Sequence, residues 1–389
     1  MKHALINRIL RRCALLGAAF ALAVFTGAQA APVYTDLHDF ANTPDGSLPI
    51  AGVRFDANDN MYGTTFNGGA LGLGILFKIG TDGAYTIVHD FGTAGDGKNP
   101  ECQPTIDRST GDIYGTTTAG GAFGYGTIWK LAGDGTYTVL YSLDGVNDGA
   151  GPVAPMLLDR LGNLYGTALQ GVGMSAGTVF KFSSDGVFTV LHFFTGPEGL
   201  APEGTIVRDR AGNIYGTAFF GGGFNVGVIY KVAPDGTFTK LYDFTGGADG
   251  RFPVGGVDND QAGNLYGTTF FGGTGGAGNV WKLAPDGTFT TLYSFCTGDC
   301  SDGAYPEGDV LRVGTYLYGT TFNGGTNDGG VIWRLGLVNG TYTVLHAFNG
   351  PEGLNPAAGQ LTSNHGVLYG TTPSGGASGN GVVFSQTKK

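Results

Sequence analysis

Basic residues are scarce in this chain, and so are cysteines. Its 389 residues include 21 Lys and Arg against 31 Asp and Glu, with a formal net charge of −10, and only four Cys. Nucleic acids and anionic membranes both require a basic surface, so this composition argues against either as a partner. After residue 30 the sequence also lacks helical apolar periodicity and any apolar run long enough to span a bilayer.

The first thirty residues are expected to be a secretory signal peptide. A basic head precedes an apolar run from Ala14 to Phe25 and the sequence Ala28-Gln29-Ala30, an order typical of an exported protein cut near the Ala30–Ala31 bond. The mature chain, residues 31–389, would lose four basic residues and no acidic one, so its formal charge would be 17 − 31 = −14. We therefore predict a secreted or periplasmic protein without a membrane span.

Glycine, in contrast, is abundant, with 74 residues that recur at fixed places in a repeat. A Tyr-Gly-Thr motif occurs seven times, at intervals of 50 to 52 residues. The motifs begin at Tyr62, Tyr114, Tyr165, Tyr215, Tyr266, Tyr318 and Tyr369. So regular a period indicates one supersecondary unit copied in tandem.

Each repeat is predicted to contain four short antiparallel strands. In the fourth copy the segments 202–209, 214–220, 228–232 and 237–244 are rich in β-branched and aromatic residues, and turns with Gly, Asn, Pro or Asp separate them. Four such strands in about 51 residues are the signature of a propeller blade. Seven copies predict an all-β, seven-bladed β-propeller over residues 31–389, with an open β-solenoid as the alternative.

The two ends of the repeat array favour the closed ring. The last copy stops after its third strand, residues 381–384, and residues 33–40 match the pattern of the fourth strand at 341–348. We expect the N-terminal strand to complete the C-terminal blade. This arrangement closes the ring and removes the exposed edge between the first and last copies.

The repeat resembles a known family. The phrases Leu-Tyr-Gly-Thr-Thr-x-x-Gly-Gly, Gly-x-Val-Phe-Lys-Leu and Asp-Gly-Thr-Phe-Thr-x-Leu-Tyr-x-Phe are similar to the GloVer tandem repeat of exported bacterial proteins, called choice-of-anchor tandem repeat proteins. The resemblance covers residues 31–385 and implies export. It carries over no catalytic role. The Asp-x-x-Gly-Asn-Leu-Tyr turn also resembles a hairpin of gluconolactonase-like propellers.

Two of the cysteines lie within one loop, Cys296-Thr-Gly-Asp-Cys300. Because export leads to an oxidising compartment, we predict a disulfide between Cys296 and Cys300. A zinc site would need further ligands, and no histidine is near them in sequence. Cys102 stands where other repeats have Ala or Gly, which indicates a small buried residue.

Comparison of the seven copies separates structural positions from candidate site positions. One strand position holds a histidine or tyrosine in every copy, which predicts aromatic packing with a polar tip. These residues are His38, His89, Tyr141, His192, Tyr242, Tyr293 and His346. A second position holds an acid in an acidic-Gly-x-x-Pro turn, which is either a side-chain-capped turn or part of a cation-binding ring. These acids are Asp45, Asp96, Asp148, Glu198, Asp249, Asp302 and Glu352.

A third position breaks the symmetry. The residue after each turn proline is glutamate in copies two, four and six only, at Glu101, Glu203 and Glu307, and Ile50, Val153, Val254 or Ala357 elsewhere. The innermost strand of a blade lines the central channel, so these three carboxylates are predicted to share one mouth, unless they are solvated loop residues. Calcium is the cation expected there, because it accepts oxygen ligands in a flexible geometry.

These observations predict an exported, monomeric, non-catalytic propeller that binds a glycan or protein through one face. The alternative is a propeller enzyme of the lyase or lactonase type, with a metal at the channel mouth.

Overall fold

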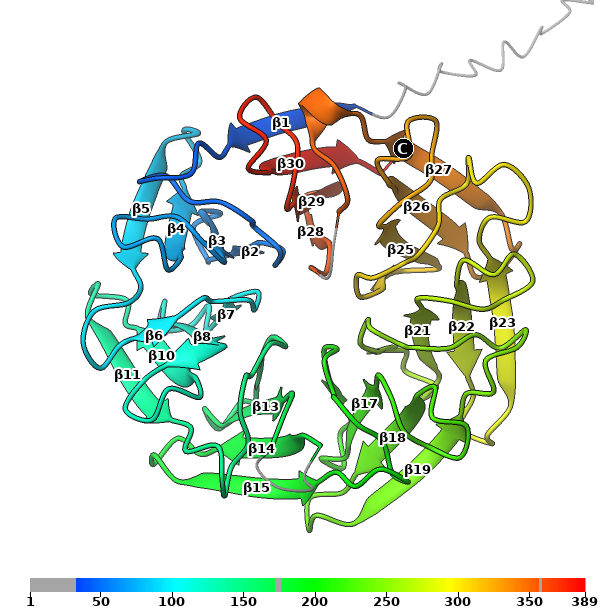
Figure 1. Ribbon diagram of the computed structural model, residues 1–389, viewed down its shortest axis with the longest axis horizontal. Coiled ribbons are helices and arrows are strands. Elements are labelled where there is room, and N and C mark those ends of the chain that lie inside the picture. The colour runs from blue at the N-terminus through cyan, green and yellow to red at the C-terminus, as the bar shows by residue number, and fades with distance from the viewer. Residues whose placement is uncertain (1–32, 172–175, 357–358, 389) are drawn as a thin grey trace, which may run out of the picture. The chain divides into compact units, whose positions relative to one another are not determined.

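We describe a computed structural model of the chain, covering residues 33–171, 176–356 and 359–388. Across these residues the chain forms seven four-stranded antiparallel sheets arranged as blades around a central axis (Figure 1). The predicted signal peptide and Ala357 lie outside the described residues. No helix in the described part is long and apolar enough to cross a membrane.

The strands of each blade are given from the axis outward. Blade 1 has β2 (Arg54–Phe55), β3 (Met61–Thr65), β4 (Ile75–Ile79) and β5 (Tyr85–Asp90). Blade 2 has β7 (Thr105–Ile106), β8 (Ile113–Thr117), β10 (Thr127–Leu131) and β11 (Tyr137–Ser142). Blade 3 has β12 (Leu157–Leu158), β13 (Leu164–Ala168), β14 (Thr178–Phe182) and β15 (Phe188–Phe193). Blade 4 has β16 (Val207–Arg208), β17 (Ile214–Ala218), β18 (Val228–Val232) and β19 (Phe238–Asp243).

The remaining blades follow the same order. Blade 5 has β20 (Asp258–Asn259), β21 (Leu265–Thr269), β22 (Asn279–Leu283) and β23 (Phe289–Ser294). Blade 6 has β24 (Leu311–Val313), β25 (Tyr316–Thr321), β26 (Val331–Gly336) and β27 (Tyr342–Ala347). Blade 7 has β28 (Thr362–Asn364), β29 (Val367–Thr372), β30 (Val382–Thr387) and β1 (Tyr34–Asp39). A small ribbon pairs β6 (Gly97–Lys98) with β9 (Ala119–Gly120), and η1 (Gly350–Glu352) is a short 3-10 helix.

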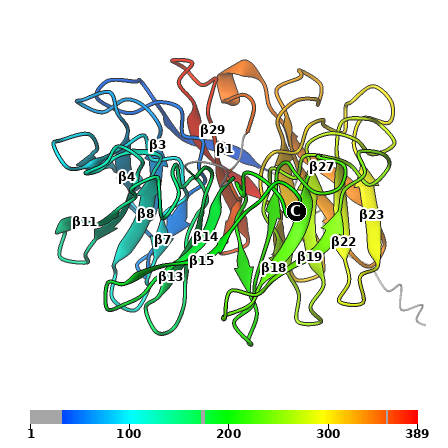
Figure 2. The same ribbon diagram turned by 60° about the horizontal axis from the view of Figure 1, so that its bottom comes forward.

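The seven-bladed propeller and its closure by the N-terminal strand are confirmed. β1 pairs with β30 in an antiparallel register that matches Tyr34 with Gln386 and Asp39 with Val382. The blue and red strands lie side by side in Figure 1. Figure 2 shows that the strands of the front blades run between the loops at the two ends of the ring.

The Tyr-Gly-Thr motif places a glycine beneath an aromatic ring in every blade. In blade 2, Gly115 pairs with Trp129 across the sheet, and a Cβ atom on Gly115 would overlap the indole ring. The same pairing joins Gly267 to Trp281 and Gly319 to Trp333. All three indoles are fully buried, so the motif is a core-packing device and the tryptophans are blade core.

The innermost strands are shorter than predicted. In the fourth copy we expected a strand over 202–209, whereas β16 covers only Val207–Arg208. The residues before it approach the axis, where glycines and side chains contact other blades instead of continuing the ladder. A Cβ atom on Gly204, for example, would overlap the backbone of Gly256 in blade 5.

Candidate functional site

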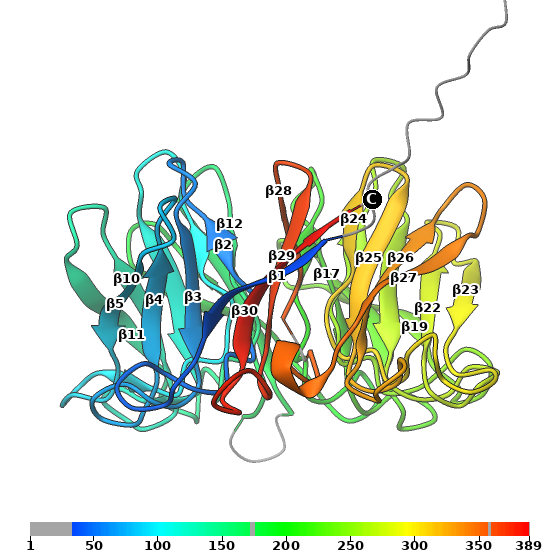
Figure 3. The same ribbon diagram turned by 90° about the horizontal axis from the view of Figure 1, so that it is seen from above.

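The seven turn acids lie in the connections from the outermost strand of one blade to the innermost strand of the next. These connections gather at one end of the ring, the lower end in Figure 3, which also carries η1 with Glu352. The opposite end carries the hairpins between the two inner strands of each blade, such as β28–β29. The channel therefore has two chemically different ends.

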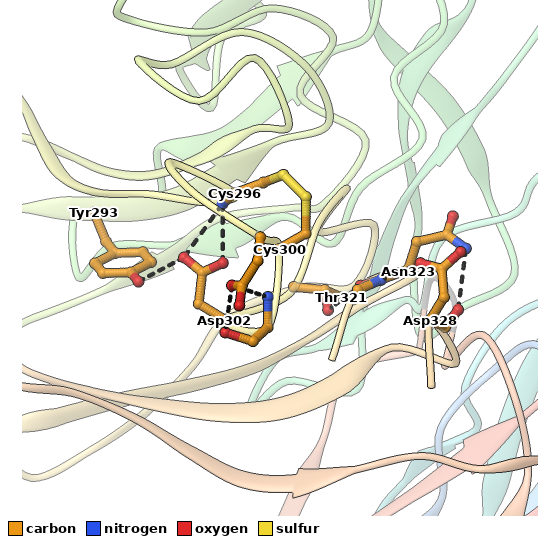
Figure 4. The surroundings of a disulfide bond; sticks show 10 residues. Tyr293, Cys296, Cys300, Asp302, Thr321, Asn323 and Asp328 are labelled. Atoms are coloured by element: carbon orange, nitrogen blue, oxygen red, sulfur yellow. Dashed lines mark hydrogen bonds between the residues drawn. A yellow bond between two sulfur atoms is a disulfide. The ribbon is translucent and has the colours of Figure 1, made fainter. Parts of the chain in front are cut away.

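Five of the seven turn acids are hydrogen-bonded to the histidine or tyrosine of the preceding outer strand, whereas Glu198 and Glu352 only lie near His192 and His346, whose Nε2 atoms form no hydrogen bond among the described residues. The shortest side-chain contacts are His38–Asp45 at 3.1 Å, His89–Asp96 at 2.9 Å, Tyr141–Asp148 at 2.8 Å, His192–Glu198 at 3.4 Å, Tyr242–Asp249 at 3.1 Å, Tyr293–Asp302 at 2.7 Å and His346–Glu352 at 3.3 Å. Backbone amides add to this, since the amide of Cys296 donates to Asp302 (Figure 4). These contacts support the capped-turn interpretation over a cation-binding ring.

The same histidines and tyrosines stack on the outer strand of the next blade. His38 stacks on Tyr85 with ring centroids 3.8 Å apart, and His89 on Tyr137 at 3.6 Å. Burial alone would raise the pKa of Asp96, but hydrogen bonds from His89 and Tyr137 lower it. The acid, the ring and the neighbouring ring thus join adjacent blades, and the predicted aromatic packing of this position is confirmed.

The two loop cysteines border one of these turns. The structure joins Cys296 and Cys300 in a disulfide, with Cα atoms 4.0 Å apart, beside Asp302 (Figure 4). Cys102 is a free, buried cysteine, and its Sγ atom accepts a hydrogen bond from the amide of Thr116 at 3.1 Å. Peptide mapping can test the pairing directly.

Glu101, Glu203 and Glu307 line one cavity of about 100 Å³ on the channel side of the innermost strands, called here the glutamate cavity. The three carboxylates form no hydrogen bond or ion pair within the described ranges. Burial, together with the charges of Glu101 and Glu307, raises the pKa of Glu203 to about 7. Burial also raises the pKa of Glu101 and Glu307. The structure thus brings together the three residues that break the repeat symmetry.

A buried polar layer closes the inner side of this cavity. In an extended chain, side chains two residues apart point to the same side. Gln103 and Asp309 therefore line the same cavity as Glu101 and Glu307. Gln103 is 1% exposed, and its Nε2 atom donates to the carbonyl of Gln360 at 3.0 Å. Its Oε1 atom is buried and has no hydrogen-bond partner among the described residues.

Glycines in blades 1 and 5 allow this layer to form. Gly52 lies between Gln103 and Gln360, where a Cβ atom would overlap both. Gly256 occupies the corresponding place between Thr205 and Asp309, and its amide and the Thr205 hydroxyl both donate to the Asp309 carboxylate. The glutamate cavity adjoins a second, larger cavity, since Pro155 and Thr205 line both.

Arg54 supports the layer from the other side. Its guanidinium donates to Gln360 Oε1 at 2.8 Å and to Thr362 Oγ1 at 3.3 Å. Burial lowers the pKa of Arg54 and raises that of Asp309, while the attraction between the two charges opposes both shifts. The sequence pattern did not predict Arg54, Gln103, Thr205, Asp309 or Gln360 as site residues. The position two residues after the glutamates holds Gln103, Thr205 and Asp309, and Arg54 stands four residues after Ile50, so a comparison of these positions between blades would have indicated four of the five.

The sequence can now be compared with known proteins. The profile of the Gloeobacter/Verrucomicrobia repeat matches residues 17–209 and 205–389. The chain belongs to this repeat family. The resemblance drawn from the Tyr-Gly-Thr phrase is therefore confirmed, and each of the two matched stretches spans several propeller blades. A search of curated proteins gives no match.

Solved structures share the propeller fold at low identity. The extracellular domain of a candidate hybrid two-component system protein from B. thetaiotaomicron matches with a TM-score of 0.59 and 11% identity, over 92% of this chain and 39% of that chain. A candidate 6-phosphogluconolactonase from Bacteroides uniformis matches with a TM-score of 0.51 and 19% identity, over 80% of this chain and 88% of that chain. At these identities the likeness concerns the fold alone.

Proposed function

We propose that this protein is an exported binding module and that its glutamate cavity receives a small cationic group carried by a glycan or protein partner. The observation that carries the proposal is the convergence of Glu101, Glu203 and Glu307 on one cavity, where no donor of the described residues pairs with them. The three glutamates are partly exposed, and bringing like charges together in a cavity disfavours their ionised forms, so a ligand that supplies positive charge and N–H donors offsets that cost.

The size of the cavity restricts the ligand. About 100 Å³ accommodates an ammonium group but not a whole sugar ring or side chain. Gln103 Oε1, buried in the lining, adds an acceptor without a donor. We therefore favour a protruding protonated amine, such as that of an amino sugar or a lysine, whose remaining atoms stay on the acidic end of the ring.

Titration calorimetry with glucosamine and with a lysine-containing tripeptide tests this function. The triple variant Glu101→Gln, Glu203→Gln and Glu307→Gln should reduce affinity at least tenfold, because each change keeps the shape of the side chain and removes its charge. Asp82→Asn is the matched control, since Asp82 is an exposed turn acid. N-acetylglucosamine, which lacks the charge, should bind more weakly than glucosamine. Equal binding by the triple variant would refute the site.

Export rests on the leader-like sequence ahead of Ala31 and is part of the same proposal. Sequencing the N-terminus of protein recovered from the periplasm or the medium should give Ala31 as the first residue. Recovery of the uncut chain in the cytoplasm would contradict export.

A lactonase or lyase is the second candidate, and the pKa of Glu203 favours it. A carboxyl that titrates near 7 is suited to act as a general base at neutral pH. Opening of δ-gluconolactone by the purified protein, measured across pH, tests this function. Activity that rises through pH 7 and is lost in Glu203→Gln would replace binding with catalysis as the function of this cavity.

A further inference from the structure

The channel end opposite the glutamate cavity contains a larger cavity, of about 810 Å³. The ends of β2, β7, β12 and β28 and the turns that follow them line it. This volume falls in the range of small-molecule sites, whereas the glutamate cavity admits only a single group. Gln103 and Asp309 line the glutamate cavity only, and Pro155 and Thr205 line both.

Three arginines line this larger cavity, called here the arginine cavity: Arg54, Arg108 and Arg160. Arg54 is half-buried and uses two of the five guanidinium donors on Gln360 and Thr362. Arg108 donates to the carbonyl of Asp56 at 3.0 Å. Arg160 is exposed and has no ion pair or hydrogen bond with any residue in the described ranges. Most of the guanidinium donors therefore remain available.

The two aspartates in the lining are already engaged. Asp107 accepts hydrogen bonds from the amide and hydroxyl of Ser109 at 2.9 and 2.6 Å. Asp159 accepts from Asn163 and Tyr165, and it lies 3.6 Å from Arg208. Neither carboxylate pairs with the arginines of the cavity, so the lining sets three guanidinium groups against two carboxylates and keeps an excess of one positive charge.

This arrangement contrasts with the rest of the chain. The protein carries a net charge of −10, yet arginines recur at the inner hairpins of three successive blades, as Arg108, Arg160 and Arg210. Each of these arginines directly follows an aspartate, so the hairpins carry both charges, and the arginines supply the N–H donors there. Arginine is also the side chain whose planar donors match the oxygens of carboxylates and phosphates.

We propose that the arginine cavity binds an organic oxyanion of mono- to disaccharide size, a carboxylate or a phosphate, with the guanidinium groups of Arg54, Arg108 and Arg160 on its charged end. Leu157 and Leu158 in the lining supply an apolar surface for the body of the ligand. The site is distinct from the glutamate cavity, and it takes the opposite charge.

Titration calorimetry at low salt tests the site with four probes: digalacturonate, glucose 6-phosphate, lactose and inorganic phosphate. We expect at least one of the two organic anions to bind and lactose to bind at least tenfold more weakly. The double variant Arg108→Gln and Arg160→Gln should reduce the affinity for that anion at least tenfold. Both residues are exposed, so the variant should keep the melting temperature of the parent. Arg251→Gln, an exposed arginine outside this cavity, is the matched control and should leave binding unchanged.

Three results would overturn the proposal. One is the absence of binding for both organic anions, and another is equal binding in the double variant and the parent. The third is inorganic phosphate binding as tightly as the organic anions, which would remove the role of the ligand body. The triple glutamate variant should bind the anion as the parent does, so failure of one site is distinguishable from failure of the other.

Discussion

Single residues in this protein separate into those repeated in all blades and those confined to a few. The turn acids recur seven times, and five of them accept a hydrogen bond from a neighbouring His or Tyr side chain, as in the 2.8 Å bond from Tyr141 to Asp148, which is 2% exposed. The other two, Glu198 and Glu352, are bonded to Thr195 and Asn349 within their own turns. Burial lowers the pKa of His346 to about 4, which keeps its ring neutral in the aromatic stack. The three glutamates that occur in alternate blades have no such partners among the described residues, and their pKa values are raised.

The raised pKa of Glu203 predicts a pH-dependent cost in stability. Its pKa is about 7 in the folded protein and 4.5 when unperturbed. Between these values the folded state holds a proton that the unfolded state lacks, so stability should fall as pH rises through this window. Glu203→Gln should therefore raise the free energy of unfolding at pH 8 by about 1 to 3 kcal/mol and leave it unchanged at pH 4.

Urea unfolding of the parent and Glu203→Gln at pH 4, 6 and 8 measures this difference. Carboxylates remote from the cavity contribute equally to both proteins, so the comparison isolates Glu203 together with its coupling to Glu101 and Glu307. Asp82→Asn serves as the control and should show no such pH-dependent gain. Parallel stability curves for Glu203→Gln and the parent would contradict the raised pKa.

Among the elements, the innermost strands depart most from the predicted pattern. Ladder hydrogen bonds extend over only two or three residues in each, as in β7 (Thr105–Ile106). The residues before them are extended, but they face a crowded axis. There, bonds such as those between Thr205 and Asp309 connect different blades. These residues lack the hydrogen bonds of a β-ladder and therefore count as loop. Their side chains nevertheless line the candidate site.

The Cys296–Cys300 disulfide closes a short loop at the turn of Asp302. In the chain-entropy account, so short a loop contributes about 2 kcal/mol through the unfolded state. Replacing both cysteines by serine should lower stability by about that amount, because the amide of Cys296 would still donate to Asp302. Non-reducing peptide mapping should find Cys296 bonded to Cys300 and Cys102 free. A bridge to Cys102 would contradict the structure.

The N-terminal strand β1 should be essential for cooperative folding. It pairs with β30, and Phe40 just after it is fully buried against Val53 and Phe77 of blade 1. A chain beginning at Ala41 would expose the edge of β30 and a core face, so it should aggregate or unfold without cooperativity, unlike a chain beginning at Ala31. Adding a peptide of residues 33–40 to the shortened chain should partly restore cooperative unfolding.

A point variant controls for the size of that deletion. Phe40→Ala should cost about 3 to 5 kcal/mol in urea unfolding, because it removes a buried ring. Leu71→Ala, at a position 51% exposed, should cost far less. A truncated chain that melts with the midpoint of the longer one would show that β1 does not close the ring.

At the scale of the whole molecule, the propeller places an acidic cavity and a basic cavity at opposite ends of one channel. The alternation of side chains along each inner strand produces this polarity, since Glu101, Gln103 and Thr105 line it in succession. The two cavities adjoin, since Pro155 and Thr205 line both.

Calcium remains a prediction for the acidic end. Within the described residues no group of three or more His, Cys, Asp or Glu side chains is placed to hold a metal ion. Binding would therefore require the glutamates to move toward the ion. We expect millimolar calcium to raise the melting temperature by a few degrees, because a ligand that binds only the folded state stabilises it. A ligand at a hundred times its Kd adds about 2.7 kcal/mol to the free energy of unfolding.

Thermal unfolding with calcium, with magnesium and with chelator measures that effect. The triple Gln variant of Glu101, Glu203 and Glu307 should lose it, and Asp82→Asn should keep it. If calcium and chelator leave the melting curve of the parent unchanged, the acidic end is a site for organic cations or a bare acidic surface, and the amine titration decides between these.

The sequence alone determined the blade, the number of blades and the closure, because each depends on local pattern repeated at a fixed period. Turn residues, strand residues and the Gly beneath each aromatic ring are all local requirements. The sequence also indicated Glu101, Glu203 and Glu307, because a repeat reveals the positions that differ between copies. Only the tertiary structure decided what these residues meet. Gln103, Asp309 and Arg54 come from different blades, and their contacts depend on how seven copies converge on one axis, which no single repeat encodes.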